Sequence, residues 1–191
     1  MSLLTTGLIL FLGVHSISIL ASGWRDRMLE RLGRGLWMGL YSIVAAIGLY
    51  LIIRGYGEAR NQTVILYQFG RWMHGVSTVL MLPVFPLLIA AYLPGSIRTA
   101  AKHPMLVAVK LWALAHLLAN GSLADVVLFG TLLTWAVADR ISLKRRPARS
   151  VPSLRPGPYN DLIAVIAGIA IYGFMLNFGH ELLIGMPLVL R

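Results

Sequence analysis

Long apolar runs separated by short polar connectors make up most of the chain. Six runs are close to the length of about 20 apolar residues that a helix needs to cross a bilayer core. Their expected bounds are Leu3–Ala21, Leu36–Ile53, Trp72–Leu93, Pro104–Ala119, Leu123–Ala138 and Leu162–Gly179. The pattern predicts an all-α, polytopic membrane helical bundle of about six transmembrane helices, with residues 1–191 forming a single transmembrane domain.

The fourth and fifth runs are shorter than the others. About 16 residues give about 24 Å of helix at 1.5 Å per residue, less than the bilayer core. Only Asn120-Gly121-Ser122 joins the two runs. We therefore expect a hairpin whose tip is recessed below the outer headgroups, with protein or a cavity around its backbone.

Composition supports lipid as the surrounding solvent. Hydrophobic residues make up 58% of the chain and charged residues 13%, against about 25% charged in soluble domains. The chain has no Cys, which excludes disulfides, thiolate metal sites, iron–sulfur clusters and haem attachment through Cys. Any metal or haem must therefore be held by His, Met, Tyr or carboxylate side chains. Because no Lys or Arg precedes the first run, we expect it to be a retained span rather than a signal peptide.

The net charge of +10 indicates topology rather than a nucleic-acid partner, because the basic residues cluster between the apolar runs. The first, third and fifth connectors hold most of them: Arg25, Arg27, Arg31, Arg34, Arg98, Lys102, Arg140, Lys144, Arg145, Arg146, Arg149 and Arg155. The positive-inside rule places these connectors in the cytoplasm and both termini on the non-cytoplasmic side. The fifth connector also contains Pro147, Pro152, Pro156 and Pro158. We interpret it as a topological anchor that attracts anionic membrane lipid.

Ionisable side chains inside apolar runs are costly in lipid and therefore mark candidate functional sites. The candidates inside the runs or at their ends are His15, His74, His103, Lys110, His116 and His180. We expect Lys110 to snorkel or to pair with Asp125 or Asp139. His103 precedes Pro104 and is expected to cap the fourth helix. His180 is the weakest candidate.

Helical spacing places two of these histidines on polar or aromatic stripes. The stripe in the first helix consists of Gly7, Phe11, His15, Ser18 and Ser22. The stripe in the fourth helix consists of Trp112, His116 and Asn120. Both imidazoles are therefore expected to face protein rather than lipid.

Two inward-facing histidines on separate helices are compatible with a bis-histidine b-type haem. His15 and His116 are then the candidate iron ligands, with His74 as a substitute. The alternative is a structural histidine that donates one hydrogen bond. His15 lies about 18 Å from the outer end of its helix and His116 about 5 Å from the hairpin tip, so the pairing needs a recessed tip or tilted helices.

Several short stretches resemble a known family. They are His103-Pro104-Met105, Leu111–Gly121, Leu128-Phe129-Gly130, Phe11–Ser16, Gly39–Ser42 and Gly55-Tyr56. On these stretches the chain resembles the NnrU family of integral membrane proteins, from Leu3 to about Arg146. The stretch Leu111–Gly121, with its W-x-x-x-H-L-L-x-N-G pattern, is the most specific, and the last run is the least diagnostic.

The NnrU family includes bacterial proteins associated with denitrification and is similar to plant 15-cis-zeta-carotene isomerase. The resemblance implies a multi-pass protein of the bacterial inner membrane with a haem b between two histidines, which fall on His15 and His116. Trp112 and Asn120 are the further cofactor-binding residues expected. The implied activity is nitrite and nitric oxide metabolism, or cis–trans isomerisation of a lipophilic polyene by ferrous haem.

Two alternatives lie outside haem chemistry. Lys102-His103-Pro104-Met105 is similar to the R-H-P-M-Y element of membrane methyltransferases that bind S-adenosylmethionine, although Lys and Leu106 replace Arg and Tyr. Of the paired late glutamates of those enzymes, only Glu181 is present. The other alternative is a non-catalytic assembly or regulatory partner of a respiratory reductase. A transporter is disfavoured because the sequence has no internal repeat.

Overall fold

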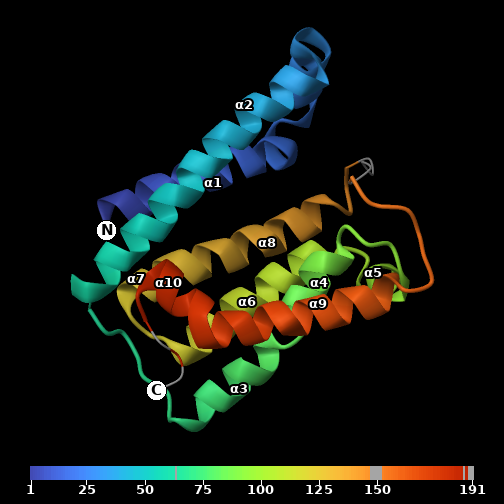
Figure 1. The fold of residues 1–191 in the computed structure, drawn as a ribbon. Helices are drawn as coiled ribbons and strands as arrows, with labels where there is room; N and C mark the ends of the chain where they lie inside the picture. Colours follow the sequence, from blue (N-terminus) through green and yellow to red (C-terminus); the bar gives the residue numbers. More distant parts are fainter. Residues whose placement is uncertain (63, 147–151, 187, 189–191) are drawn as a thin grey trace. The chain divides into compact units, whose positions relative to one another are not determined.

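The computed structural model describes residues 1–62, 64–146, 152–186 and 188. Pro147 and Arg149 of the fifth connector lie outside these ranges. The described chain is helical apart from its loops and one isolated bridge (Figure 1), which confirms the all-α prediction. It divides into two compact units, Met1–Val64 (unit 1) and Ile65–Arg191 (unit 2).

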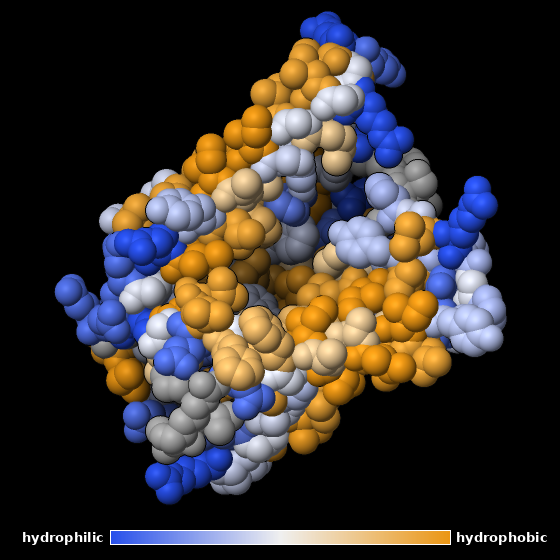
Figure 2. All heavy atoms as spheres, viewed as in Figure 1, coloured by the Kyte–Doolittle hydropathy of each residue, from blue (hydrophilic) through white to orange (hydrophobic). Residues whose placement is uncertain are grey.

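Four helical stretches in the described residues are long and apolar enough to cross a membrane. They are Ser2–Leu20, Ser22–Gln62, Trp72–Ala90 and Asn160–Ile184, and Pro104–Ala119 is a shorter apolar helix. Figure 2 shows hydrophobic side chains exposed along the helices and hydrophilic ones gathered near helix ends. Ile9 and Leu182, for example, are 72% and 77% exposed. An exterior this apolar suits contact with lipid rather than water.

Unit 1 is a hairpin of α1 (Ser2–Leu20) and α2 (Ser22–Ala59), followed by a short 3-10 turn. Small residues let the two helices approach closely. A Cβ atom at Gly7 would lie 2.6 Å from the Ile52 nitrogen, and one at Gly48 would lie 2.7 Å from the Phe11 nitrogen. Glycine at these positions therefore determines how tightly the hairpin packs.

The helix α2 extends well beyond the predicted run Leu36–Ile53. It is kinked at Gly33, where φ is 74° and ψ is 161°, a conformation that is essentially restricted to glycine. The turns before the kink carry Arg25, Arg27 and Arg31. The prediction was too short because charged turns can continue a helix past the apolar residues that cross the bilayer.

Unit 2 is built around a central helix, α6. Its elements are α3 (Trp72–Met81), α4 (Val84–Ala90), α5 (Ser96–Ala101), α6 (Pro104–Ala119), α7 (Leu123–Asp125), a π-helical turn (Val126–Gly130), α8 (Thr131–Ser142), α9 (Asn160–Phe174), a second π-helical turn (Met175–Gly179) and α10 (His180–Ile184). The helix α6 packs against α3, α4 and α8, and α9 packs on α4. The core between α4 and α6 contains Val84, Leu87 and Ala108.

The predicted bounds in unit 2 hold for the fourth run and fail for the third and fifth. α6 begins at Pro104 and ends at Ala119, as expected. The third run is interrupted at Leu82-Pro83, because proline disrupts the hydrogen bonding of a helix interior. The fifth run was predicted to end at Ala138 but continues to Ser142, and Asp139 is tolerated there because Arg146 pairs with it at 2.7 Å.

The third and fifth connectors meet at one end of unit 2. The Leu154 nitrogen donates to the Tyr92 oxygen at 2.9 Å. The Asn160 side chain donates to the Pro94 oxygen at 2.8 Å. The Asp161 carboxylate accepts a bond from the Ser96 nitrogen at 2.7 Å.

The end of the second connector and the fourth connector meet at the other end of unit 2. The nitrogens of Leu66 and Tyr67 both donate to the Gly121 oxygen, at 2.8 and 3.2 Å. The apolar runs of unit 2, rather than the individual helices, therefore alternate between these two ends.

Candidate functional site

His116 lies on α6 in an aromatic setting. Its Nδ1 is 2.8 Å from the Trp112 oxygen, which can only accept, so Nδ1 carries the proton and Nε2 is the ring acceptor. The imidazole stacks on Phe129, with ring centroids 4.5 Å apart and an interplanar angle of 26°. Trp112 meets Phe129 edge to face at 4.9 Å. The backbone and Phe129 together fix the orientation of this imidazole.

Two π-helical turns contribute to the surroundings of His116. Phe129 belongs to the first, Val126–Gly130, and the second, Met175–Gly179, ends directly before His180. The His180 imidazole is within electrostatic range of His116. Because π-helical turns frequently occur at functional sites, their position here singles out His116. From the sequence, His180 was the weakest candidate and Phe129 had no expected role in the site. Neither could be found by helical spacing, because no spacing rule reveals a π-helical turn.

Side chains hydrogen-bond to two carbonyl oxygens in the last turn of α6. The Asn120 amide donates to the His116 oxygen at 3.2 Å, and the Tyr67 hydroxyl donates to the Leu117 oxygen at 2.7 Å. Gly121 is required, since a Cβ atom there would overlap the Tyr67 carbonyl oxygen. The hairpin tip is thus packed against the end of the second connector, and its recession in the membrane stays a prediction.

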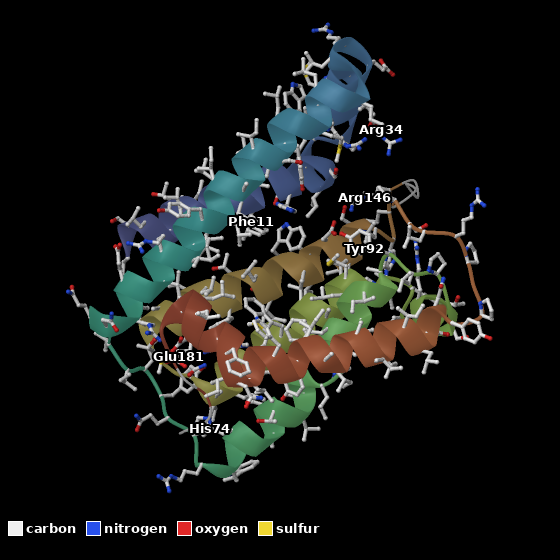
Figure 3. All side chains as sticks on the ribbon, viewed as in Figure 1. Phe11, Arg34, His74, Tyr92, Arg146 and Glu181 are labelled. Atoms are coloured by element: carbon white, nitrogen blue, oxygen red, sulfur yellow. The ribbon has the colours of Figure 1, made fainter. Side chains whose placement is uncertain are left out.

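A polar cavity of about 290 Å³ lies beside this tip. Its lining includes Tyr67, His74, Asn120, Ser122 and Asp125. The structure therefore brings together two of the predicted residues, Asn120 and His74. Figure 3 labels His74 near the start of α3. His116 does not line this cavity.

Ser122 and Asp125 form a reciprocal capping box at the start of α7. The Asp125 nitrogen donates to the Ser122 hydroxyl at 3.2 Å, and the Ser122 nitrogen donates back to Asp125 Oδ2 at 2.9 Å. The Ser122 hydroxyl also donates to Asp125 Oδ2, at 2.6 Å. Partial burial and the negative charge of Asp125 raise the pKa of the Tyr67 phenol above its ordinary value. Tyr67 therefore remains a hydrogen-bond donor over a wide pH range.

His15 has a similar setting within unit 1. Its Nδ1 is 2.6 Å from the oxygen of Phe11, four residues earlier. Nδ1 of His116 has the same relation to the oxygen of Trp112. Its ring lies 4.2 Å from Phe11 and 5.3 Å from Tyr41 of α2, measured between ring centroids. Together with the close approach of Gly7 to α2, these contacts confirm that this stripe faces protein.

The two histidines belong to different units, His15 to unit 1 and His116 to unit 2. Among the described residues, no group of three or more His, Asp or Glu side chains is arranged to hold a metal ion. The donor sets are instead single imidazoles oriented by the backbone.

Comparison with known proteins gives one family. The model of the family described as NnrU protein matches residues 3–188. The chain belongs to the NnrU family. The match extends past Arg146 and includes the last run, so the resemblance covers more of this NnrU family member than its motifs indicated. No curated protein and no solved structure matches it.

One alternative for Lys110 and the capping role of the His103 side chain are not borne out in this NnrU family member. Asp139 pairs with Arg146, which lies just beyond the end of α8, whereas snorkelling of Lys110 stays a prediction. His103 makes no capping hydrogen bond with its side chain, although Pro104 occupies the first turn as predicted. The His103 imidazole instead lies among the charged groups of α8.

Proposed function

We propose that this NnrU family protein is a six-span membrane protein that binds haem b through His15 and His116. The observation that carries the proposal is the shared anchoring of the two imidazoles. In each, Nδ1 lies within 2.6 to 2.8 Å of the carbonyl oxygen four residues earlier. His180 differs, because its Nδ1 lies 3.0 Å from the oxygen of Met186, six residues later in the chain.

The residues present fit such a group. Iron-binding histidines usually donate their second ring N–H to a carbonyl, which fixes the ring and raises the basicity of the ligating nitrogen. The Phe11 and Trp112 carbonyls serve this role, and Phe129 limits rotation of the His116 ring. When bound, haem b supplies a redox-active iron. The chain's own residues orient the two imidazoles and surround them with aromatic side chains.

The arrangement of unit 2 supports the six-span topology. The third and fifth connectors meet at one end and the second and fourth at the other, as alternating spans require. The positive-inside rule then assigns the first of these ends to the cytoplasm and both termini to the other side. The proposed location of the protein is the bacterial inner membrane.

The activity proposed with this cofactor is isomerisation of a lipophilic polyene or a step in nitrite and nitric oxide metabolism. The two are separated by adding each class of substrate to the reduced, purified protein. A substrate that reaches the iron or its surroundings changes the absorption spectrum and is converted. A substrate of the wrong class does neither.

The test of haem binding is the reduced-minus-oxidised absorption spectrum of protein purified after haem supplementation. We expect a b-type spectrum in the wild type, and its loss or conversion to high spin in both His15→Ala and His116→Ala. His74→Ala is the matched control and should keep the wild-type spectrum. Absence of haem from the folded wild type would refute the proposal, and loss of the spectrum in His74→Ala alone would transfer ligation to His74.

A further inference from the structure

The backbone between α5 and α6 is strained at Lys102. Its φ of 59° and ψ of −44° are rare for a residue with a side chain. The His103 nitrogen donates to the Ala101 oxygen at 2.6 Å, which closes a tight γ-turn around Lys102. Strained turns of this kind persist only where the surrounding structure holds them. This one presents Lys102 at the surface, where α6 begins.

Basic side chains converge on this turn. The charges that act on the His103 imidazole come from Lys102, Arg140, Arg146 and Asp139. The carboxylate in this set is already paired with Arg146 at 2.7 Å, and both side chains are largely buried, at 13% and 16% exposed. Partial burial, followed by the nearby cations, lowers the pKa of His103 below its ordinary value.

Two arginines, one on the helix before this turn and one just after α8, retain unused guanidinium donors. Among the described residues, Nη1 of Arg98 and Nη1 of Arg146 are buried and have no hydrogen-bond partner. Arg98 belongs to the turn that leads into the strained residue, since its oxygen accepts from the Lys102 nitrogen at 2.9 Å. Figure 3 labels Arg146 just beyond the end of α8. Buried donors of this kind are normally satisfied, so their presence points to a missing acceptor.

We propose that these residues bind the phosphate group of an anionic phospholipid. The site, here termed the Lys102 corner, consists of Arg98, Lys102, His103, Arg140 and Arg146. A phosphate brings several acceptor oxygens, whose geometry matches the fork of a guanidinium. It also compensates an excess of positive charge that Asp139 alone does not balance.

The position of the corner favours a lipid over a free phosphate. It lies where the third and fifth connectors meet, at the start of α6 and the end of α8. At the ends of membrane helices the abundant phosphate groups are those of lipid headgroups, and basic pockets on the cytoplasmic side bind them. The inference is independent of haem binding, because none of these residues is a proposed ligand.

The experiment measures the titration midpoint of His103 by NMR, in full-length protein with labelled histidine rings. The protein is placed in nanodiscs of phosphatidylcholine alone or with added phosphatidylglycerol. His74, at the other end of unit 2, reports the general surface potential of the same bilayer. We expect the anionic lipid to raise the His103 midpoint more than the His74 midpoint, since a bound phosphate favours the charged imidazole.

Variants distinguish a built site from general attraction. Arg98→Gln and Lys102→Gln should each remove the extra rise at His103. Arg155→Gln, an exposed arginine of the fifth connector, is the matched control and should keep it. Arg146→Gln is avoided because it breaks the ion pair with Asp139. Circular dichroism checks that each variant keeps the wild-type helix content.

Three outcomes would overturn the proposal. The first is an equal rise at His103 and His74, which would mean surface potential only. The second is an extra rise that survives in both Arg98→Gln and Lys102→Gln. The third is the same extra rise on adding inorganic phosphate to neutral nanodiscs, which would make free phosphate rather than a headgroup the ligand.

Discussion

The backbone of a helix can prepare a histidine for ligation before any ligand is present. In α1 and α6 the carbonyl oxygen four residues earlier accepts a hydrogen bond from Nδ1, so Nε2 is the unprotonated nitrogen of each neutral ring. The spacing of each stripe in the sequence predicted the protein-facing position of these rings. The stacking of His116 on Phe129 was not predictable, because it depends on a π-helical turn in another helix.

The capping box at the hairpin tip gives a prediction about stability. Replacing Ser122 with Ala removes two hydrogen bonds between Ser122 and Asp125, so we expect the free energy of unfolding to fall by about 1–2 kcal/mol. Thermal unfolding in detergent measures the change. Ser122→Thr keeps the hydroxyl and should lie close to the wild type. Equal losses in the two variants would contradict the capping role.

The lowered pKa of His103 gives a prediction about pH. Between the ordinary pKa of 6.5 and the lower value in the folded protein, the unfolded chain binds more protons at this residue. Stability from this group is therefore present above pH 6.5 and is lost as the pH falls through that window. In neutral detergent, the thermal midpoint should fall less on acidification in His103→Gln than in the wild type. An identical fall in both would show that His103 contributes nothing.

At the scale of elements, helix contact depends on small residues and on breaks in regular geometry. The sequence predicted α6 to the residue, since Pro104 and Asn120 bound the apolar run. It failed at the end of α8, where an ion pair with Arg146 allows the helix to continue through Asp139. A pair between a helix and the turn that follows it has no signature in local hydropathy.

The α1–α2 hairpin offers a matched pair of glycine substitutions. Gly7→Ala should weaken the hairpin by about 1–3 kcal/mol, because the new Cβ atom meets the backbone of α2. Gly13 lies on the same helix with nothing within 4 Å of a Cβ atom. Gly13→Ala should therefore be neutral or stabilising by up to about 1 kcal/mol, through helix propensity. Unfolding by SDS titration in mixed micelles measures both, and a reversed order would contradict the close packing at Gly7.

At the scale of the whole molecule, charge counting predicts that the third and fifth connectors share a side. Bonds between these two connectors at one end of unit 2 agree with that grouping. The full arrangement of six spans stays a prediction, and four helical stretches of the described residues are long and apolar enough to cross a membrane. The cavity beside the hairpin tip was not predictable, since it depends on how the second connector folds back on Gly121.

The absence of cysteine makes this topology directly testable. Single cysteines introduced into the wild type have no background labelling. We expect a membrane-impermeant maleimide to label Gln62→Cys in intact cells, and to label Thr99→Cys and Arg155→Cys only after permeabilisation. All three positions are exposed. Labelling of Thr99→Cys and Gln62→Cys from the same side would contradict the alternating arrangement.

The bend at Gly33 bears on how the first hairpin can sit in a bilayer. A straight α2 of 38 residues would measure about 57 Å, nearly twice the bilayer core. We expect the bend to let Ser22–Leu32, with its arginines, follow the headgroup layer while the apolar part crosses the hydrocarbon. In that arrangement, one residue with a positive φ would set the height of His15 along the membrane normal.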